Sequence, residues 1–264
     1  MFAITLILLF VGVVAGVLAG LLGIGGGLVI VPALVWLLMA RGLDGAEAVP
    51  VAVATSLATM LLTATSAVWF QHRRGALDWP AIARLAPAVA AGAAAGAGLA
   101  IVIPGRALAL IFAGIVAVIG LRMLLATATR PLDRPAWPRL WWLAGPAIGA
   151  ASAMIGIGGG SFNVPYLARN GYVMVRAVAI ASACGWPIAA AGTLVFMLST
   201  VELPGMDWHI GHVWLPAMAL IGLAGMMTAP AGVALAHYLP AARLRRLFGG
   251  VLILVAIRMA VGIG

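Results

Sequence analysis

Ten apolar segments alternate with short polar stretches along the 264 residues, and no polar stretch is long enough to form a separate soluble domain. A helix rises 1.5 Å per residue, so about 20 apolar residues are needed to cross a hydrocarbon core about 30 Å thick. The second segment of each half of the chain is shorter than that. The pattern predicts an all-α polytopic membrane protein with a single transmembrane domain. The expected segments are residues 2–22, 28–40, 47–70, 80–103, 106–128, 138–155, 161–169, 174–200, 210–237 and 241–263.

A GIGGG sequence precedes each short segment. Glycine costs about 1 kcal/mol per position relative to alanine inside a helix, so these clusters predict helix breaks. A bilayer tolerates such breaks only where the backbone lines a cavity or is buried in protein, and paired breaks indicate the central site of a transporter. Pro32 and Pro165, in the early turns of the half-helices that follow, are predicted to mark structural breaks as well. The cluster glycines are Gly23, Gly25, Gly26, Gly27, Gly156, Gly158, Gly159 and Gly160.

The two halves of the chain, residues 1–130 and 137–264, are predicted to be copies of one unit. The second glycine cluster follows the first by 133 positions, and residues 95–123 align without a gap on residues 231–259. Because each copy has an odd number of segments, the second copy enters the membrane from the opposite side. We therefore expect two inverted repeats of about five hydrophobic segments each, with the glycine-broken helices at the interface between them.

The distribution of arginines predicts the orientation. If each short segment returns to the side on which the preceding segment began, ten loop arginines share one side, and only Arg41 and Arg106 lie on the other. Eight simple spans would instead divide these twelve arginines five to seven, against the positive-inside rule. The first arrangement places both termini on the outer face. Whether the pair 2–22 and 28–40 spans or re-enters stays open. The ten arginines are Arg73, Arg74, Arg130, Arg134, Arg139, Arg169, Arg176, Arg243, Arg245 and Arg246.

Composition excludes several classes of function. The chain is 65% hydrophobic and only 8% charged, so it is not a water-soluble globule, and its net charge of +9 sits at membrane borders rather than in a nucleic-acid-binding patch. A lone Cys184 permits neither an internal disulfide nor a multi-cysteine metal site. His209 and His212 have no third ligand pattern nearby, so no metal and no cofactor are expected.

The placement of acidic residues narrows the function further. All six lie in or near loops, so no carboxylate at membrane depth serves as a proton relay or cation site. No nucleotide-binding glycine–lysine loop is present either, so ATP is not the direct energy source. An intramembrane enzyme would need clustered His, Asp, Cys or Glu at membrane depth, where the sequence offers only Cys184. The chain is not expected to be an enzyme.

The glycine clusters have the chemistry of an anion site. Successive N–H groups of a curved glycine backbone can point into one concavity, and the half-helix that follows adds its positive N-terminal end. Two such elements could hold one small anion at the midplane, although glycines that only permit close packing remain an alternative. Further candidate donors are Thr55, Ser56, Ser161, Asn163 and Ser182.

Two other features have a structural and a functional interpretation. Arg122 and Arg258 occupy matching positions near segment ends, where they either snorkel to the interface or take part in gating. Gly12, Gly16 and Gly20 give the first segment a smooth face, for packing within the chain or for a homodimer.

Three stretches resemble the TauE/SafE sulfite exporter family: residues 20–32 (GLLGIGGGLVIVP), 52–57 (AVATSL) and 156–165 (GIGGGSFNVP). The resemblance covers essentially the whole chain, and it implies a bacterial-type inner-membrane permease that moves sulfite or organosulfonates, usually outward. The second half departs from the first in having Ala183-Cys184 where the first has Ser56-Leu57. The expected function is a secondary transporter exporting a small sulfur oxyanion, and the alternative is an anion channel.

Overall fold

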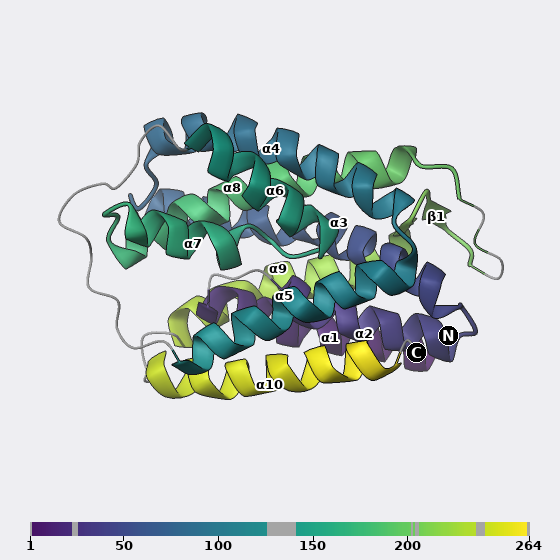
Figure 1. Cartoon of the computed structure of the whole chain (residues 1–264). Coiled ribbons are helices and arrows are strands. Elements are labelled where there is room, and N and C mark those ends of the chain that lie inside the picture. The colour runs from purple at the N-terminus through teal and green to yellow at the C-terminus, as the bar shows by residue number, and fades with distance from the viewer. Residues whose placement is uncertain are drawn as a thin grey trace.

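The computed structural model describes residues 2–22, 26–125, 141–201, 203, 206–235 and 241–262, and the elements in them are almost all helices (Figure 1). The helices are α1 (Phe2–Leu22), α2 (Gly27–Ala40), α3 (Gly45–Arg73), α4 (Trp79–Val102), α5 (Gly105–Leu125), α6 (Trp141–Met154), α7 (Gly160–Arg169), α8 (Met174–Leu198), α9 (Leu215–Leu235) and α10 (Ala241–Gly262). Two short strands, β1 (His209–Ile210) and β2 (Val213–Trp214), pair antiparallel between α8 and α9.

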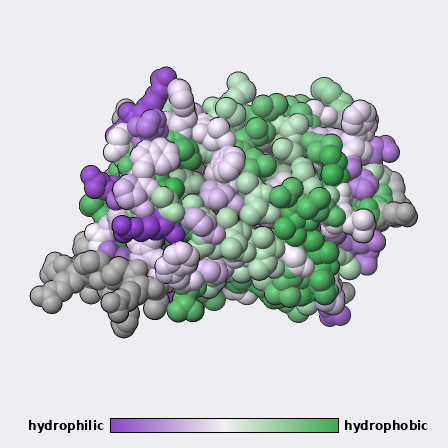
Figure 2. Space-filling model, turned by 90° about the horizontal axis from the view of Figure 1, so that it is seen from above, coloured by the Kyte–Doolittle hydropathy of each residue, from purple (hydrophilic) through white to green (hydrophobic). Residues whose placement is uncertain are grey.

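Six helices of the described chain are long and apolar enough to cross a membrane: α1, α3, α4, α5, α8 and α9. α2 is apolar but shorter, with 14 residues, and α7 has only 10. Seen from one side, a hydrophobic band separates two more hydrophilic ends of the molecule (Figure 2). The chain is therefore a multi-pass helical membrane protein, as the hydrophobic pattern predicts.

The helices on either side of each glycine cluster form a hairpin. α1 runs toward the end of the molecule where α5 finishes, and α2 returns; α6 and α7 make the opposite excursion (Figure 1). α2 and α7 end in the same way, with Gly42 (φ 94°) and Gly171 (φ 86°) in the left-handed conformation that closes a Schellman motif. In these motifs the N–H of Leu43 donates to Leu38 O, and that of Tyr172 donates to Leu167 O. The two short helices thus reverse the chain at opposite ends of the molecule.

Helices from opposite halves pack against each other through small residues: α1 lies on α9, and α6 lies on α4. Gly232 of α9 lies against the carbonyl oxygen of Val17, and Gly96 of α4 lies against that of Ala150, with no room for a Cβ atom at either glycine. Val17 and Ala150 are separated by the 133-residue offset of the glycine clusters, and Gly96 and Gly232 by 136. Two further pairs of contacts are related by the same offsets. Gly12 contacts Ala224 as Gly145 contacts Ala88, and Gly16 contacts Gly225 as Gly149 contacts Val89.

These contacts assign the smooth face of the first helix to packing within the chain. Without side chains at Gly12 and Gly16, the backbones of α1 and α9 approach closely enough for dispersion and weak Cα–H···O contacts. The face that was a candidate for a homodimer is therefore covered by α9.

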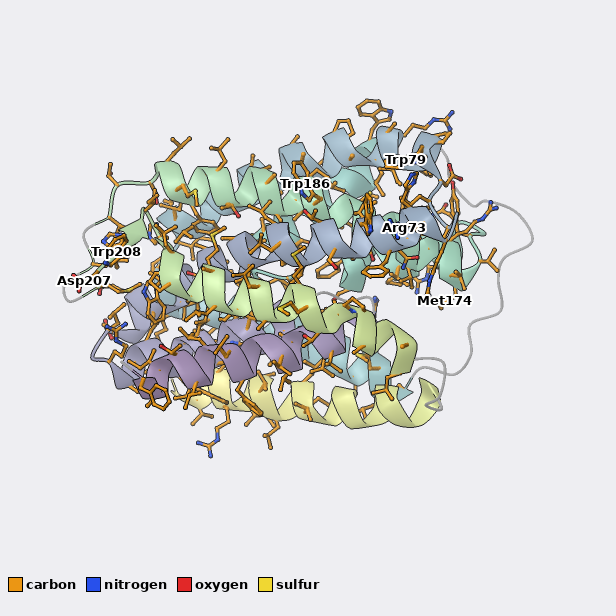
Figure 3. All side chains as sticks on the ribbon, turned by 180° about the vertical axis from the view of Figure 1, so that it is seen from behind. Arg73, Trp79, Met174, Trp186, Asp207 and Trp208 are labelled. Carbon is orange, nitrogen blue, oxygen red and sulfur yellow. The ribbon has the colours of Figure 1, made fainter. Side chains whose placement is uncertain are left out.

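The two ends of the molecule differ in charge. Arg73, Trp79 and Met174 lie at one end, and Asp207 and Trp208 lie at the other (Figure 3). The start of α1, the end of α10 and the β-hairpin share the end that carries Asp207 (Figure 1). We call the first the arginine end and the second the hairpin end.

The hairpin corrects the start of the ninth expected segment, residues 210–237. Residues 209–214 form the two strands, and α9 begins only at Leu215. Trp214, the last residue of β2, is 4% exposed. Its backbone N–H donates to Thr55 Oγ1 (3.0 Å), and the Arg41 guanidinium lies 5.1 Å from its ring centre. The hairpin therefore packs into the bundle and covers the interior from this end.

Candidate functional site

The two glycine clusters meet inside the protein. Gly27, the first residue of α2, lies so close to the carbonyl oxygen of Gly156 that a Cβ atom there would overlap it. Gly156 has φ 64°, which lets the chain reverse between α6 and α7. Ser56 of α3 donates to the same carbonyl oxygen (2.8 Å) and is fully buried. The second break is thus fixed by α2 and α3 from the other half of the chain.

Both half-helices begin without a side-chain cap. The N-cap residues are Gly26 for α2 and Gly159 for α7, and neither helix has a side-chain hydrogen bond at its N-cap. A helix leaves its first N–H groups without backbone partners, and Ser, Thr, Asp or Asn at the N-cap normally satisfies one of them. A glycine there leaves the donors and the positive end of the helix dipole available to a ligand.

A cavity begins at the N-terminus of α7. Its wall includes the backbone of residues 158–160, Ser182 of α8, and the ends of α1 and α9. One face of α3 forms the opposite wall from Met60 to Arg74, which are 14 positions or about 21 Å apart along the axis. The centre of a water molecule can occupy about 80 Å³ of this space. The cavity is therefore large enough for a small ion and its water, and it runs from the break to the arginine end.

The polar groups of this wall are donors or neutral groups. They are Thr63, Ser66, Gln71, Arg74 and Ser182, and the lining contains no acidic residue among those the structure describes. The Ser182 hydroxyl donates to Val178 O (2.8 Å) within its own helix. Its oxygen keeps its acceptor lone pairs, and the residue lines the cavity. The electrostatic character of the cavity favours an anion over a cation.

Asn163 stands out among the predicted donors. It lies in the first turn of α7, it is 0% exposed, and neither atom of its amide has a hydrogen-bond partner among the described residues. A Cβ atom on Gly159, which lines the cavity, would overlap its Nδ2. The Ser161 hydroxyl is also buried and without a described partner. Since buried polar groups are nearly always paired, these two residues point to a ligand at this helix terminus.

The structure divides the predicted site residues into groups. Gly158, Gly159, Gly160 and Ser182 line the cavity, with Ser161 and Asn163 directly behind. Gly26, Gly27, Gly156, Thr55 and Ser56 form the packed support beside it: Thr55 accepts the Trp214 N–H, and Ser56 holds Gly156. Gly23 and Gly25 lie outside the described residues.

One prediction differs from the structure, and another stays untested. α2 and α7 continue through Pro32 and Pro165, the sixth residue of each helix, so the breaks lie at the glycines and not at the prolines. A proline at this position removes one i→i−4 hydrogen bond without ending the helix. Arg122 and Arg258 are exposed on α5 and α10 and do not line the described part of the cavity. Whether they snorkel to the interface or take part in gating stays a prediction.

Sequence reasoning named Thr55 and Ser56 of α3 but missed the face of this helix that lines the cavity. Its wall residues Met60, Thr63, Ala67, Gln71 and Arg74 recur every three to four positions, which is the period of one helix face. Polar residues at this spacing inside an apolar segment were the available signal.

His212 has a structural contact: its Nδ1 lies 2.6 Å from Ser199 Oγ. The described chain holds no group of three potential metal ligands.

Comparison with known proteins agrees with this architecture. The model of the family described as "Sulfite exporter TauE/SafE" matches residues 8–259. A "Probable membrane transporter protein" of Haemophilus influenzae is 35% identical, covering 98% of this chain and 99% of its own length. Similar proteins of Methanocaldococcus jannaschii (25% identical, 93% and 91% covered) and Bacillus subtilis (26%, 81% and 82%) are also called probable membrane transporters. No solved structure gives a significant match.

Proposed function

The chain belongs to the sulfite exporter TauE/SafE family, and from this premise we propose that it is a secondary transporter that exports a small sulfur oxyanion, sulfite or an organosulfonate. The names of the family and of the relatives imply transport rather than catalysis. The observation that carries the proposal is the cavity, which begins at an uncapped helix N-terminus and ends at an arginine.

The proposed binding site lies at the start of α7. An oxyanion there accepts hydrogen bonds from the free N–H groups of the first turn. It is also stabilised by the helix dipole, which is equivalent to about half a positive charge at this end. Asn163 supplies an amide donor, and Ser161 and Ser182 supply hydroxyls. A sulfite or sulfonate group presents three oxygens that accept such donors, and the low dielectric of the buried site strengthens each bond.

Alternating access follows from the repeat. We propose that residues 1–130 and 137–264 are inverted repeats, because contacts between α1 and α9 recur between α6 and α4 at the offsets of the sequence repeat. A structure with two such halves has two related conformations, reached when the halves exchange their arrangement around a fixed site. The described conformation has its cavity toward the arginine end, whereas the hairpin covers the other end.

The proposed direction is outward. By the positive-inside rule the arginine end faces the cytoplasm of a bacterial-type inner membrane, and both termini lie outside. A potential of 100 mV, negative inside, drives two negative charges outward with about 4.6 kcal/mol. Export of a dianion needs no coupling ion, in line with the absence of acidic residues from the part of the cavity wall that the structure describes.

The test is solid-supported-membrane electrophysiology on purified protein in liposomes. Sulfite, methanesulfonate, sulfate, chloride and acetate are applied in turn to the wild type, Gly159→Ala and Gly98→Ala. We expect saturable currents for sulfite or the sulfonate, at least tenfold smaller in Gly159→Ala because the new Cβ displaces Asn163. Gly98→Ala is the matched control, since its Cβ meets no atom within 4 Å.

Three outcomes contradict the proposal. Absence of any anion current from folded wild-type protein, without electroneutral uptake of radiolabelled sulfite, overturns the transport of sulfur anions. Non-saturating currents without exchange between internal and external anion indicate the channel. Equal currents in Gly159→Ala and Gly98→Ala, both folded, remove the binding site from the start of α7.

A further inference from the structure

We propose, on the basis of the function proposed above, that Arg74 is the residue that recruits the anion from the cytoplasm and favours dianions over monoanions. Arg74 is the C-cap residue of α3, where its backbone N–H donates to Phe70 O (3.2 Å). Its side chain is exposed and forms part of the cavity wall. The residue thus stands where the cavity reaches the arginine end.

The charge of Arg74 faces the cavity without compensation. Arg74 is the one charged residue of the cavity wall as far as the structure describes it, and no described residue forms an ion pair with it. The acid that follows in sequence, Asp78, uses its side chain to accept the Ala81 N–H at the start of α4 (3.1 Å). Within the described wall, an anion that moves toward α7 passes only this cation.

The preceding residue has a different role. The Arg73 guanidinium lies 4.6 Å from the ring centre of Trp69, a half-exposed side chain, and Arg73 is not in the cavity wall. Successive residues of a helix point about 100° apart, so the two neighbouring arginines face different surroundings. Arg73 anchors α3 at the membrane interface, in the way that stacked aromatic and basic residues do.

The position of Arg74 determines what its charge can do. Low-dielectric walls focus the electric field of a charge at the opening along the cavity, and this field raises the local concentration of counter-ions. The attraction energy doubles for a dianion, so loss of the charge reduces dianion capture by about the square of the reduction for a monoanion. The effect appears in KM and weakens as salt increases, because the residue is solvent-exposed.

The experiment measures uptake of radiolabelled sulfite and of a monoanionic sulfonate into inverted membrane vesicles, which present the cytoplasmic face to the medium. The variants are Arg74→Gln, Arg74→Lys and the matched control Arg73→Gln. At alkaline pH, where sulfite is a dianion, we expect Arg74→Gln to raise the KM for sulfite about tenfold and that for the sulfonate about threefold, with kcat nearly unchanged. Arg74→Lys restores most of the sulfite affinity, and Arg73→Gln changes either KM by less than about twofold.

The outcomes separate this inference from the proposed function. If wild-type vesicles take up neither anion, the proposed function fails. If the wild type transports but the two glutamine variants behave alike, or Arg74→Gln changes both substrates equally at every salt concentration, Arg74 is not the recruiting residue. Comparable thermal transitions for all variants exclude misfolding, which is not expected because the described hydrogen bond of Arg74 comes from its backbone.

Discussion

Asn163 is the residue at which stability and function conflict most directly. A fully buried amide without partners costs free energy, and an apolar side chain of similar size would pack in its place without that cost. Residues that lower stability in this way are concentrated at functional sites. We therefore propose that Asn163 serves the binding site rather than the packing of α7.

Asn163→Leu is expected to leave the melting temperature unchanged or to raise it by a few degrees, while transport falls at least tenfold. The matched control, at the C-cap of the same helix, is Asn170→Leu. Asn170 Nδ2 donates to Tyr166 O (2.8 Å), so this variant loses about 1 kcal/mol of stability but should keep its KM. Thermal unfolding in detergent and sulfite transport in liposomes measure the two effects. A destabilised Asn163→Leu with normal transport would show that the amide is structural.

The hydroxyl groups illustrate how far sequence alone could predict the site. Ser182 was a candidate because of its place in a segment, and it does line the cavity. Thr55 and Ser56 were candidates for the same reason, yet both hydroxyls make hydrogen bonds that hold the fold together. Thr55 accepts from the Trp214 N–H, and Ser56 donates to Gly156 O. Composition places a hydroxyl at a depth in the membrane, but only packing determines whether it faces a cavity or a carbonyl group. For the same reason Arg74 was indistinguishable from Arg73 before the helix faces were known.

At the scale of elements, the helices were predictable because hydrophobic length fixes them, whereas the hairpin was not. Ile210, Val213 and Trp214 continue the apolar run of α9, so a helix beginning at residue 210 was expected. The hairpin depends on a turn at Gly211 (φ 53°) and on contacts with α3 and α8. Gly211 has no room for a side chain, since a Cβ atom there would overlap the carbonyl oxygen of Phe196. Such tertiary contacts leave no trace in hydrophobic periodicity.

The hairpin should lose stability in acid through His212. This residue is 8% exposed, and its Nδ1 lies beside the Ser199 hydroxyl. Its ring packs edge to face with that of Phe196, with 5.9 Å between the ring centres. Burial, and to a smaller extent the charge of His209, lower its pKa below the usual 6.5. The neutral ring is therefore favoured in the fold. The stability it contributes is complete above pH 6.5 and decreases as the pH falls from there toward the lowered pKa.

We expect the melting temperature of the wild type to fall by several degrees between pH 7 and pH 5, and that of His212→Gln to fall less. Differential scanning fluorimetry across this range measures both slopes. His72→Gln is the control, because His72 contacts Trp79 at the arginine end and has no contact with the hairpin in the described structure. Identical slopes for wild type and His212→Gln would exclude His212 as the acid-sensitive group.

At the scale of the whole molecule, the sequence predicts a duplication, but it does not predict how the two halves pack. The matched glycines at positions 96 and 232 suggested common ancestry, and the structure shows that each lies against the first helix of the other half. Each half therefore packs its first helix chiefly against a helix of the other half. Relative motion of the halves would therefore rearrange contacts between small residues, and large side chains at these positions would obstruct it.

The proposed inversion of the second half gives a prediction that depends on the whole fold. Asp44 and Val173 are the N-cap residues of α3 and α8, the third segments of the two halves. Both are exposed, and each follows the Schellman turn of its half-helix. Parallel copies would place them on the same side of the membrane, whereas inverted copies place them on opposite sides. Since Cys184 is the single cysteine of the chain and is buried, a Cys184→Ala background allows each position to be labelled separately.

In intact spheroplasts, a membrane-impermeant maleimide should label Asp44→Cys and leave Val173→Cys unlabelled until the membrane is permeabilised. Asp207→Cys, at the hairpin end, should behave like Asp44→Cys and serves as the control for access from outside. Labelling of both N-cap positions from the same side would refute the inverted repeat. Labelling of Val173→Cys alone would keep the inversion but reverse the orientation, and the cavity would then open outward. The sulfur anion would in that case be captured from outside, against the membrane potential that makes uncoupled export favourable.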